Sequence, residues 1–176
     1  LRMTEPTVPT LPLTGLRIID FTRVLAGPLC TMLLGDMGAE VIKIEDPEHG
    51  DETRGWAPFV GTTSTYFASV NRNKKSVTVD IKSADGMALV ADLIRTADVL
   101  VENFRPGTLA RLGFGPAHAQ GLNERLIYCS ISGYGQDGPP ARRAGTDRPR
   151  SPRTGVCSRR RCSARETSAH RPRYRA

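Results

Sequence analysis

The sequence predicts an α/β fold, with a Rossmann-like parallel sheet covered by helices on both faces. Five short apolar runs have the length and composition of buried strands. Stretches with helical spacing of apolar residues separate several of these runs, and such alternation is typical of a parallel sheet. A chain of 176 residues can form one good hydrophobic core, so we expect one domain. Ligands of this fold class bind beyond the carboxyl ends of the strands.

The first two predicted strands flank a helix. Residues 1–14 are rich in proline and threonine and are interpreted as a leader. The apolar runs at 16–21 and 40–45 predict the first and second strands. Between them, Pro28 suits the first turn of a helix, where its missing N–H costs nothing, and Gly38 suits the C-terminal cap.

A second helix is expected after the third strand. Residues 46–64 contain glycine, proline and acidic residues and predict an excursion loop before the strand at 77–81. Ser83 can cap the next helix, and the carboxylate of Asp85 suits its positive end. One side of this helix is expected to be apolar, with Met87, Val90, Ala91 and Ile94.

The remaining predicted elements are short. Residues 99–101 and 126–131 predict the fourth and fifth strands. Two short helices are expected between them, at 108–112 and 116–120. The five strands should then form one parallel sheet within residues 15–135.

The composition changes abruptly after Asp147, so the folded part is expected to be 15–147. Residues 1–147 carry 15 basic and 17 acidic side chains, whereas 148–176 carry ten arginines and one acid. The formal net charge of +7 therefore does not indicate a nucleic-acid footprint on the folded part. Residues 148–176 have too few apolar side chains to offset their chain entropy and are expected to be disordered. Arginine without lysine is typical of GC-rich codons read out of frame, an interpretation we favour over a basic nucleic-acid-binding arm.

Common catalytic and metal-binding patterns are missing from the sequence. The four cysteines form no Cys-x-x-Cys pair and the three histidines share no metal-ligand spacing, so neither a zinc site nor a disulfide framework is expected. There is no P-loop, no G-x-S-x-G elbow, and no G-x-G-x-x-G after the first strand. Without a membrane-spanning stretch or a signal-peptide pattern, the sequence predicts a soluble, cytoplasmic protein.

Basic and amide side chains instead gather in loops beside the strands. Residues 21–28 join the first strand to the first helix, where an open α/β sheet presents backbone N–H groups to phosphate. Residues 71–76 precede the third strand, and residues 102–107 follow the fourth. Each segment alone is more often a turn with solvated charges. Together they predict a site for a polyanion that has an aromatic or adenine part.

Five segments in this order resemble the class III CoA-transferases. That family includes formyl-CoA transferase, carnitine CoA-transferase and the bile-acid-inducible protein F relatives, and α-methylacyl-CoA racemase shares its fold. The resemblance covers residues 13–147. It rests on GLRIIDFTRVLAGP, GDMGAEVIKIEDP followed by HGDETR, NRNKKSVTVDIKS, ADVLVENFRPGTLARLGFG and LIYCSISGYGQDGP.

The resemblance implies an incomplete large domain of such a transferase, with a smaller domain and an interlocked homodimer in the intact family. It implies coenzyme A or acyl-CoA and a carboxylic acid as substrates, and the ligand spacings in the sequence indicate no metal. Lys82 and Arg111 would pair with phosphates, and Phe104 would line the adenine. The CoA-binding positions that it implies are Leu25, Ala26, Val79, Asp80, Ile81, Lys82, Asn103, Phe104, Arg105 and Arg111.

Three positions depart from the family pattern. Asp46 stands where formyl-CoA transferase has an arginine near the CoA, and Arg23 stands where it has a histidine. The resemblance therefore does not assign formyl-CoA and oxalate as substrates. Thr146 stands where the racemases have a catalytic histidine, which disfavours racemisation.

The family mechanism uses an aspartate that attacks the acyl-CoA thioester to form an enzyme-bound anhydride. The CoA thiolate then gives an aspartyl thioester, and the acceptor carboxylate completes the exchange. The segment with this aspartate is not found here, and Asp147 is the only candidate nearby. We therefore expect a truncated CoA-transferase that is inactive by itself. The alternatives are a racemase-like enzyme, a non-catalytic CoA-binding fragment and, more remotely, a nucleic-acid binder with a basic arm.

Overall fold

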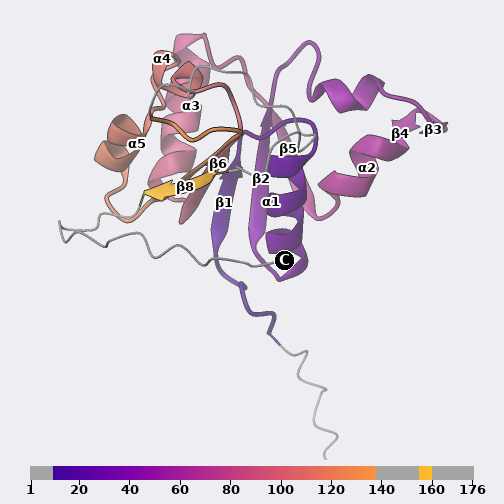
Figure 1. Cartoon of the computed structure of the whole chain (residues 1–176), viewed down its shortest axis with the longest axis horizontal. Helices are drawn as coiled ribbons and strands as arrows, with labels where there is room; N and C mark the ends of the chain where they lie inside the picture. The colour runs from indigo at the N-terminus through magenta and orange to yellow at the C-terminus, as the bar shows by residue number, and fades with distance from the viewer. Residues whose placement is uncertain (1–9, 138–154, 160–176) are drawn as a thin grey trace, which may run out of the picture.

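A six-stranded sheet, in the order β5-β2-β1-β6-β7-β8, forms the centre of the molecule (Figure 1). In this computed structural model, residues 10–137 and the backbone of residues 155–159 are described. No helix within these residues has the length and apolar character needed to cross a lipid bilayer.

The first five strands of this sheet are parallel. β1 (Arg17–Asp20) pairs with both β2 (Glu40–Glu45) and β6 (Val99–Glu102). β2 pairs with β5 (Lys74–Thr78), and β6 pairs with β7 (Ile127–Ser132). The parallel α/β fold predicted from the sequence is therefore confirmed.

The strand order reverses beside β1. The chain moves outward from β1 through β2 to β5 and then crosses back to β6, on the other side of β1. In open α/β sheets such a switch point leaves a crevice outside the carboxyl ends of the two diverging strands. A ligand site is therefore expected between the loops after β1 and β6.

Helix α1 (Ala26–Asp36) covers one face of the sheet (Figure 1). Neighbouring residues of a strand point to opposite faces, so Ile18 and Ile19 of β1 belong to two different buried clusters. Leu34 of α1 packs against the cluster of Ile18. As the sequence predicts, Pro28 lies in the first turn of α1 and Gly38 follows the helix with a φ of 103°.

Three helices cover the other face of the sheet, α3 (Ala84–Arg95), α4 (Thr108–Arg111) and α5 (Pro116–Leu122). Ser83 caps α3 as predicted, because its Oγ accepts a hydrogen bond from the backbone N–H of Gly86 at 3.0 Å. The side chains that these helices bury against the sheet include Val90, Ile94, Leu109 and Ala119.

Strand β5 begins three residues earlier than predicted, at Lys74. Asn73 adopts a φ of 62° and turns the chain into the strand, and Lys74 pairs with Val41 of β2. The prediction followed the apolar residues after position 76. It missed the polar start of the strand because the charge of Lys74 is hidden by an ion pair with Asp20, 54 residues away.

The excursion loop contains more regular structure than predicted. It includes a 3₁₀ turn (Glu52–Gly55) and a hairpin of β3 (Phe59–Val60) and β4 (Thr63–Ser64). Helix α2 (Thr65–Asn71) follows directly. The Oγ of Ser64 caps this helix by accepting a hydrogen bond from the backbone N–H of Phe67. These elements extend to one side of the sheet (Figure 1).

A short strand lies inside the segment that the sequence predicts to be disordered. β8 (Gly155–Arg159) pairs with β7 in antiparallel orientation, with Gly155 opposite Ser132. Backbone pairing at a sheet edge needs no apolar run, so a composition argument does not anticipate it. The rest of the segment 148–176 lies outside the described residues.

Candidate functional site

A pocket of about 320 Å³ opens at the carboxyl ends of the strands, on both sides of the switch point. We call it the switch-point pocket. Its walls come from the ends of β1, β2 and β6 and from the turn between β5 and α3. The residues that line it are Phe21, Arg23, Ile44, Glu45, Asp46, Val79, Asp80, Ile81, Lys82, Phe104, Thr108 and Leu112.

Half of the sequence-predicted CoA-binding positions line this pocket. Phe104 comes from the loop after β6, and the other four come from the turn after β5, Val79, Asp80, Ile81 and Lys82. Val79 is buried at 5% exposure, whereas the Lys82 side chain lies at the surface. A half-buried ring and an exposed cation therefore border the same cavity.

Arg23 joins these residues from the loop after β1. Its guanidinium carbon lies 5.3 Å from the centre of the Phe104 ring, a cation–π contact. The side chain of Asn103 fixes this arrangement, because its Oδ1 accepts from the Arg23 N–H and its Nδ2 donates to the Arg23 carbonyl, both at 2.8 Å. Asn103 thus acts as a bridge between the two loops rather than as part of the pocket lining.

Four other predicted positions also lie outside the pocket lining. Leu25 is the N-cap residue of α1, and Ala26 is the first residue of that helix. Arg105 is exposed in the loop before α4. Arg111 is exposed on α4, where its Nη2 donates to Thr108 Oγ1 at 3.1 Å. Since Thr108 lines the pocket, the Arg111 guanidinium lies near its rim.

Two acidic residues shape the pocket by accepting hydrogen bonds from their own loops. Asp80 Oδ1 accepts from the backbone N–H of Lys82 at 2.9 Å. Asp46 Oδ1 accepts from the backbone N–H groups of His49 and Glu48, and these bonds lower the pKa of Asp46. Asp46 therefore holds its loop in place at the position where the family resemblance puts an arginine.

Glu45, at the end of β2, lines the pocket, and its carboxylate is paired with donors of this chain. Burial by itself would raise its pKa, but the Arg54 side chain, Ser76 Oγ and the Asp51 N–H all donate to the carboxylate. Arg54 binds it through two hydrogen bonds, of 2.7 and 2.6 Å. Together these donors lower the pKa of Glu45 to about 2, so the carboxylate is ionised but paired.

Glu102, at the end of β6, supports Phe104. The Glu102 Oε2 accepts a hydrogen bond from the Phe104 N–H at 2.8 Å. Burial raises the pKa of Glu102 despite opposing hydrogen bonds from Ser130 and the Phe104 backbone. The backbone of Phe104 is therefore held by a buried carboxyl group beneath the pocket.

A buried polar network lies under the loop between β1 and α1, and the sequence analysis did not find it. It contains two acids, Asp20 and Asp51, and two lysines, Lys43 and Lys74. The sequence carries a signal for it, because Lys43 interrupts the apolar run of β2, and in the structure this lysine is only 1% exposed. A charge inside a buried strand requires a partner and therefore indicates a network.

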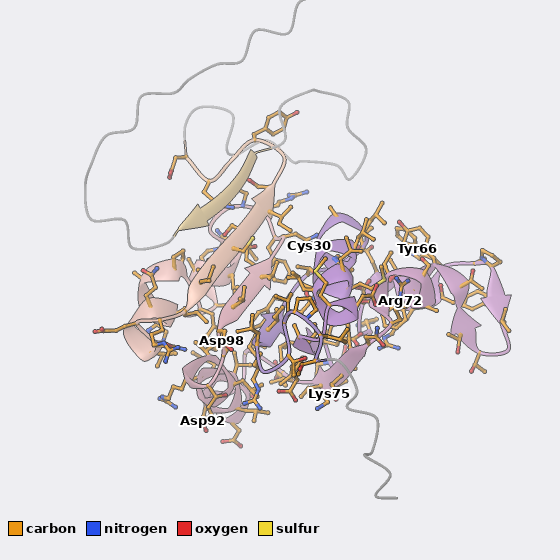
Figure 2. All side chains as sticks on the ribbon, turned by 90° about the horizontal axis from the view of Figure 1, so that it is seen from below. Cys30, Tyr66, Arg72, Lys75, Asp92 and Asp98 are labelled. Atoms are coloured by element: carbon orange, nitrogen blue, oxygen red, sulfur yellow. The ribbon has the colours of Figure 1, made fainter. Side chains whose placement is uncertain are left out.

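The segment 71–76, predicted as part of the polyanion site, does not line the pocket. Its cations pair with acids of this chain: Arg72 with Asp36 at 2.6 Å and Lys75 with Glu40 at 2.7 Å. Lys74 pairs with the buried Asp20. In Figure 2, Arg72 and Lys75 lie to the right of Asp92 and Asp98.

The remaining chemical candidates lie apart from this pocket. Among the described residues, no group of three His, Cys, Asp or Glu side chains is placed to hold a metal ion. His49 and His118 are exposed. Asp147 and Thr146 lie outside the described residues. A larger cavity of about 680 Å³ opens near the amino ends of β6 and β7 and contains none of the predicted site residues.

Comparison with known proteins points to one family. The family model described as CoA-transferase family III matches residues 13–174, beyond the end of the resemblance found in the sequence. Succinyl-CoA:glutarate CoA-transferase of Mus musculus is 55% identical over 146 residues, 82% of this chain and 34% of that protein. Acetyl-CoA:oxalate CoA-transferase of Acetobacter aceti is 50% identical over 138 residues, 78% of this chain and 36% of that protein.

A solved structure agrees with these matches. The crystal structure of a CAIB/BAIF family protein from Brucella suis superimposes with a TM-score of 0.75 and 44% sequence identity. The match covers 79% of this chain and 38% of that protein. The chain thus spans about a third of the length of the curated relatives that it matches.

Proposed function

The chain belongs to CoA-transferase family III, and on this basis we propose that its switch-point pocket binds CoA for transfer between an acyl-CoA and a carboxylic acid. One observation supports the proposal most strongly. Arg23, Lys82 and Phe104 come from three separate loops and border a single pocket. A ring beside two cations suits a ligand that joins adenine to phosphates.

Each of these side chains has a role in the proposed complex. The Phe104 ring stacks on the adenine, and the Arg23 guanidinium stays over the same ring or turns to a phosphate. Lys82, which has no acidic partner among the described residues, provides a second cation at the mouth. Arg111 provides a third from the rim, next to Thr108.

The acceptor is proposed to be a dicarboxylic acid. The names of the mouse and Acetobacter relatives pair a CoA thioester with glutarate or oxalate, and both acids are dicarboxylic. No catalytic carboxylate is proposed among the described residues, and Asp147, the one candidate from the sequence, lies outside them. The proposal also includes a cytoplasmic homodimer that uses no metal and binds neither nucleic acid nor membrane. Sedimentation of the purified protein tests the dimer.

Calorimetry tests CoA binding directly. The purified chain is titrated with CoA, and saturable binding is expected. Phe104→Leu keeps an apolar side chain but removes the ring, so CoA affinity should fall about tenfold or more, as expected for one lost base–aromatic stack. Lys75→Met is the matched control, because Lys75 pairs with Glu40 away from the pocket. Absence of CoA binding, or equal affinity of the Phe104→Leu variant, would contradict the proposal.

A further inference from the structure

Two buried lysines lie beneath the loop that joins β1 to α1. The side chains of Lys43 and Lys74 are each only 2% exposed. Burying an ammonium group costs several kcal/mol unless it is well paired. Each lysine has a fully buried acidic partner, Asp51 at 2.9 Å from Lys43 and Asp20 at 3.0 Å from Lys74.

Each lysine also donates to a backbone carbonyl, one at the start of this loop and one in the first turn of α1, just beyond the end of the loop. Lys43 Nζ donates to the Thr22 carbonyl at 2.7 Å. Lys74 Nζ donates to the Pro28 carbonyl at 2.9 Å. These two carbonyls bracket residues 23–27, which include Arg23 of the switch-point pocket. The start of the loop and the start of α1 are therefore held by charged donors from β2 and β5, the two neighbouring strands on one side of β1.

The conformation of the loop needs such support. Val24 has a φ of 70°, in a region that a β-branched residue avoids. Gly27 lies against Thr22 so closely that a Cβ on Gly27 would be 2.3 Å from the Thr22 Cβ. Asp20 Oδ1 adds a hydrogen bond from the Thr22 N–H at 2.8 Å. A strained, tightly folded loop persists only where its surroundings hold it.

We propose that Lys43 and Lys74 are positioning residues that set the affinity of the switch-point pocket by holding the loop with Arg23. The proposal rests on the proposed CoA-binding function. Replacing a buried ion pair with apolar groups of similar size often leaves stability unchanged. The particular contribution of these lysines is then the hydrogen bond that each makes to the loop.

A paired variant separates positioning from stability. Lys43→Met with Asp51→Asn removes both charges and the bond to the Thr22 carbonyl, while the amide oxygen introduced at position 51 can still accept from Thr53 as the carboxylate of Asp51 does. We expect a folded variant whose CoA affinity, measured by calorimetry on its folded fraction, is at least about tenfold weaker. The matched control is Lys75→Met with Glu40→Gln, an exposed pair on the same two strands, and its affinity should not change.

Amide hydrogen exchange provides a second readout that is independent of CoA. In the paired variant the amides of residues 23–27 should exchange faster, while those of β1 and β2 keep their protection. Lys74→Met with Asp20→Asn repeats the test at the other end of the loop if the first variant does not fold. Wild-type CoA affinity in the paired variant would overturn the proposal, and unchanged loop exchange would show that the lysines do not hold the loop.

The two proposals fail in different ways. If the wild-type chain does not bind CoA, the proposed function is wrong, and the exchange measurement alone then decides whether the lysines hold the loop. If the wild-type chain binds CoA and the paired variant binds it equally well, the lysines are not positioning residues and the proposed function stands.

Discussion

Glu45 and Arg54 illustrate how single residues tune the pocket. Glu45 lies in the pocket wall, but its carboxylate forms an ion pair with Arg54. The Arg54 guanidinium carbon also lies 3.8 Å from the centre of the Phe67 ring. The carboxylate therefore presents little free negative charge to an anionic ligand. The same pairing links the stability of the fold to pH.

The loss of unfolding free energy at acid pH should depend on the ion pair of Glu45 and Arg54. The pKa of Glu45 falls from 4.5 to about 2 on folding, so its contribution is complete above pH 4.5 and is lost as the pH falls toward 2. The contribution is up to about 3 kcal/mol, less after screening at the partly exposed Arg54. Urea denaturation across this pH range should show a shallower acid loss in Arg54→Met than in the wild type.

An exposed arginine is the control for that measurement. Arg95 pairs with Asp92 at the surface of α3, where an ion pair contributes little. Arg95→Met should therefore lose unfolding free energy at acid pH to the same extent as the wild type. If Arg54→Met also loses it to that extent, Arg54 does not lower the pKa of Glu45.

Glu102 should show the opposite dependence on pH. Its pKa is raised above 4.5 on folding, so its ionisation opposes folding as the pH rises through 4.5 and above. Glu102→Gln keeps an acceptor for the Phe104 N–H and removes the charge. The variant should gain stability relative to the wild type as the pH rises from about 4 to about 7, measured by urea denaturation. A constant difference across this range would contradict the raised pKa.

At the scale of elements, the start of α3 and the turn after β5 are built as one unit. Gly86 in the first turn of α3 approaches the turn so closely that a Cβ would be 1.9 Å from the Asp80 carbonyl oxygen. The turn residues 79–82 line the switch-point pocket. Packing of this helix therefore determines the shape of one pocket wall.

Two Gly→Ala substitutions in helices separate the steric effect of this close approach on stability from the effect of helix propensity. Gly86→Ala should lower the free energy of unfolding by about 3 kcal/mol, because the Asp80 backbone must move, and should weaken CoA binding. Gly121 in α5 has no atom within 4 Å of an added Cβ, so Gly121→Ala should raise stability by up to about 1 kcal/mol. Thermal denaturation of both variants measures the difference, and similar effects would contradict the packing argument.

At the scale of the whole molecule, the distribution of charge decides how an anion can bind. The ten arginines of residues 148–176 make the chain basic, whereas residues 1–147 have more acidic than basic side chains. An anionic ligand can therefore be recognised by a shaped pocket or by an arginine-rich segment. These two modes differ in their selectivity.

Competition should separate the two modes. If CoA binds in the switch-point pocket, excess duplex DNA should not displace it, because DNA does not fit a pocket of about 320 Å³. CoA affinity should still fall as salt is raised from about 0.05 to about 0.5 M, and Lys82→Met should reduce this salt dependence. Displacement of CoA by DNA, measured by fluorescence with a labelled CoA, would indicate binding to the arginine-rich segment instead.

The strands, the helix ends and the family follow from local patterns in the chain. Pro28, Gly38 and Ser83 act through backbone geometry within a few residues, and the order of apolar runs predicts a parallel sheet. The five segments that resemble the family are also continuous stretches, so they are visible without a structure. The turn 79–82 and Phe104 could be assigned to the pocket by this resemblance.

The buried network and the internal pairing of the segment 71–76 depended on contacts between distant parts of the chain. Lys74 looks like a solvated cation in its own segment, but strand pairing brings it to Asp20, 54 residues away. Asn103 likewise reaches Arg23 across 80 residues and bridges the two loops, outside the pocket lining. A cation that the fold pairs with an acid, as it pairs Lys74 with Asp20, is less available to an anionic ligand, and the arrangement of strands around β1 determines these pairs.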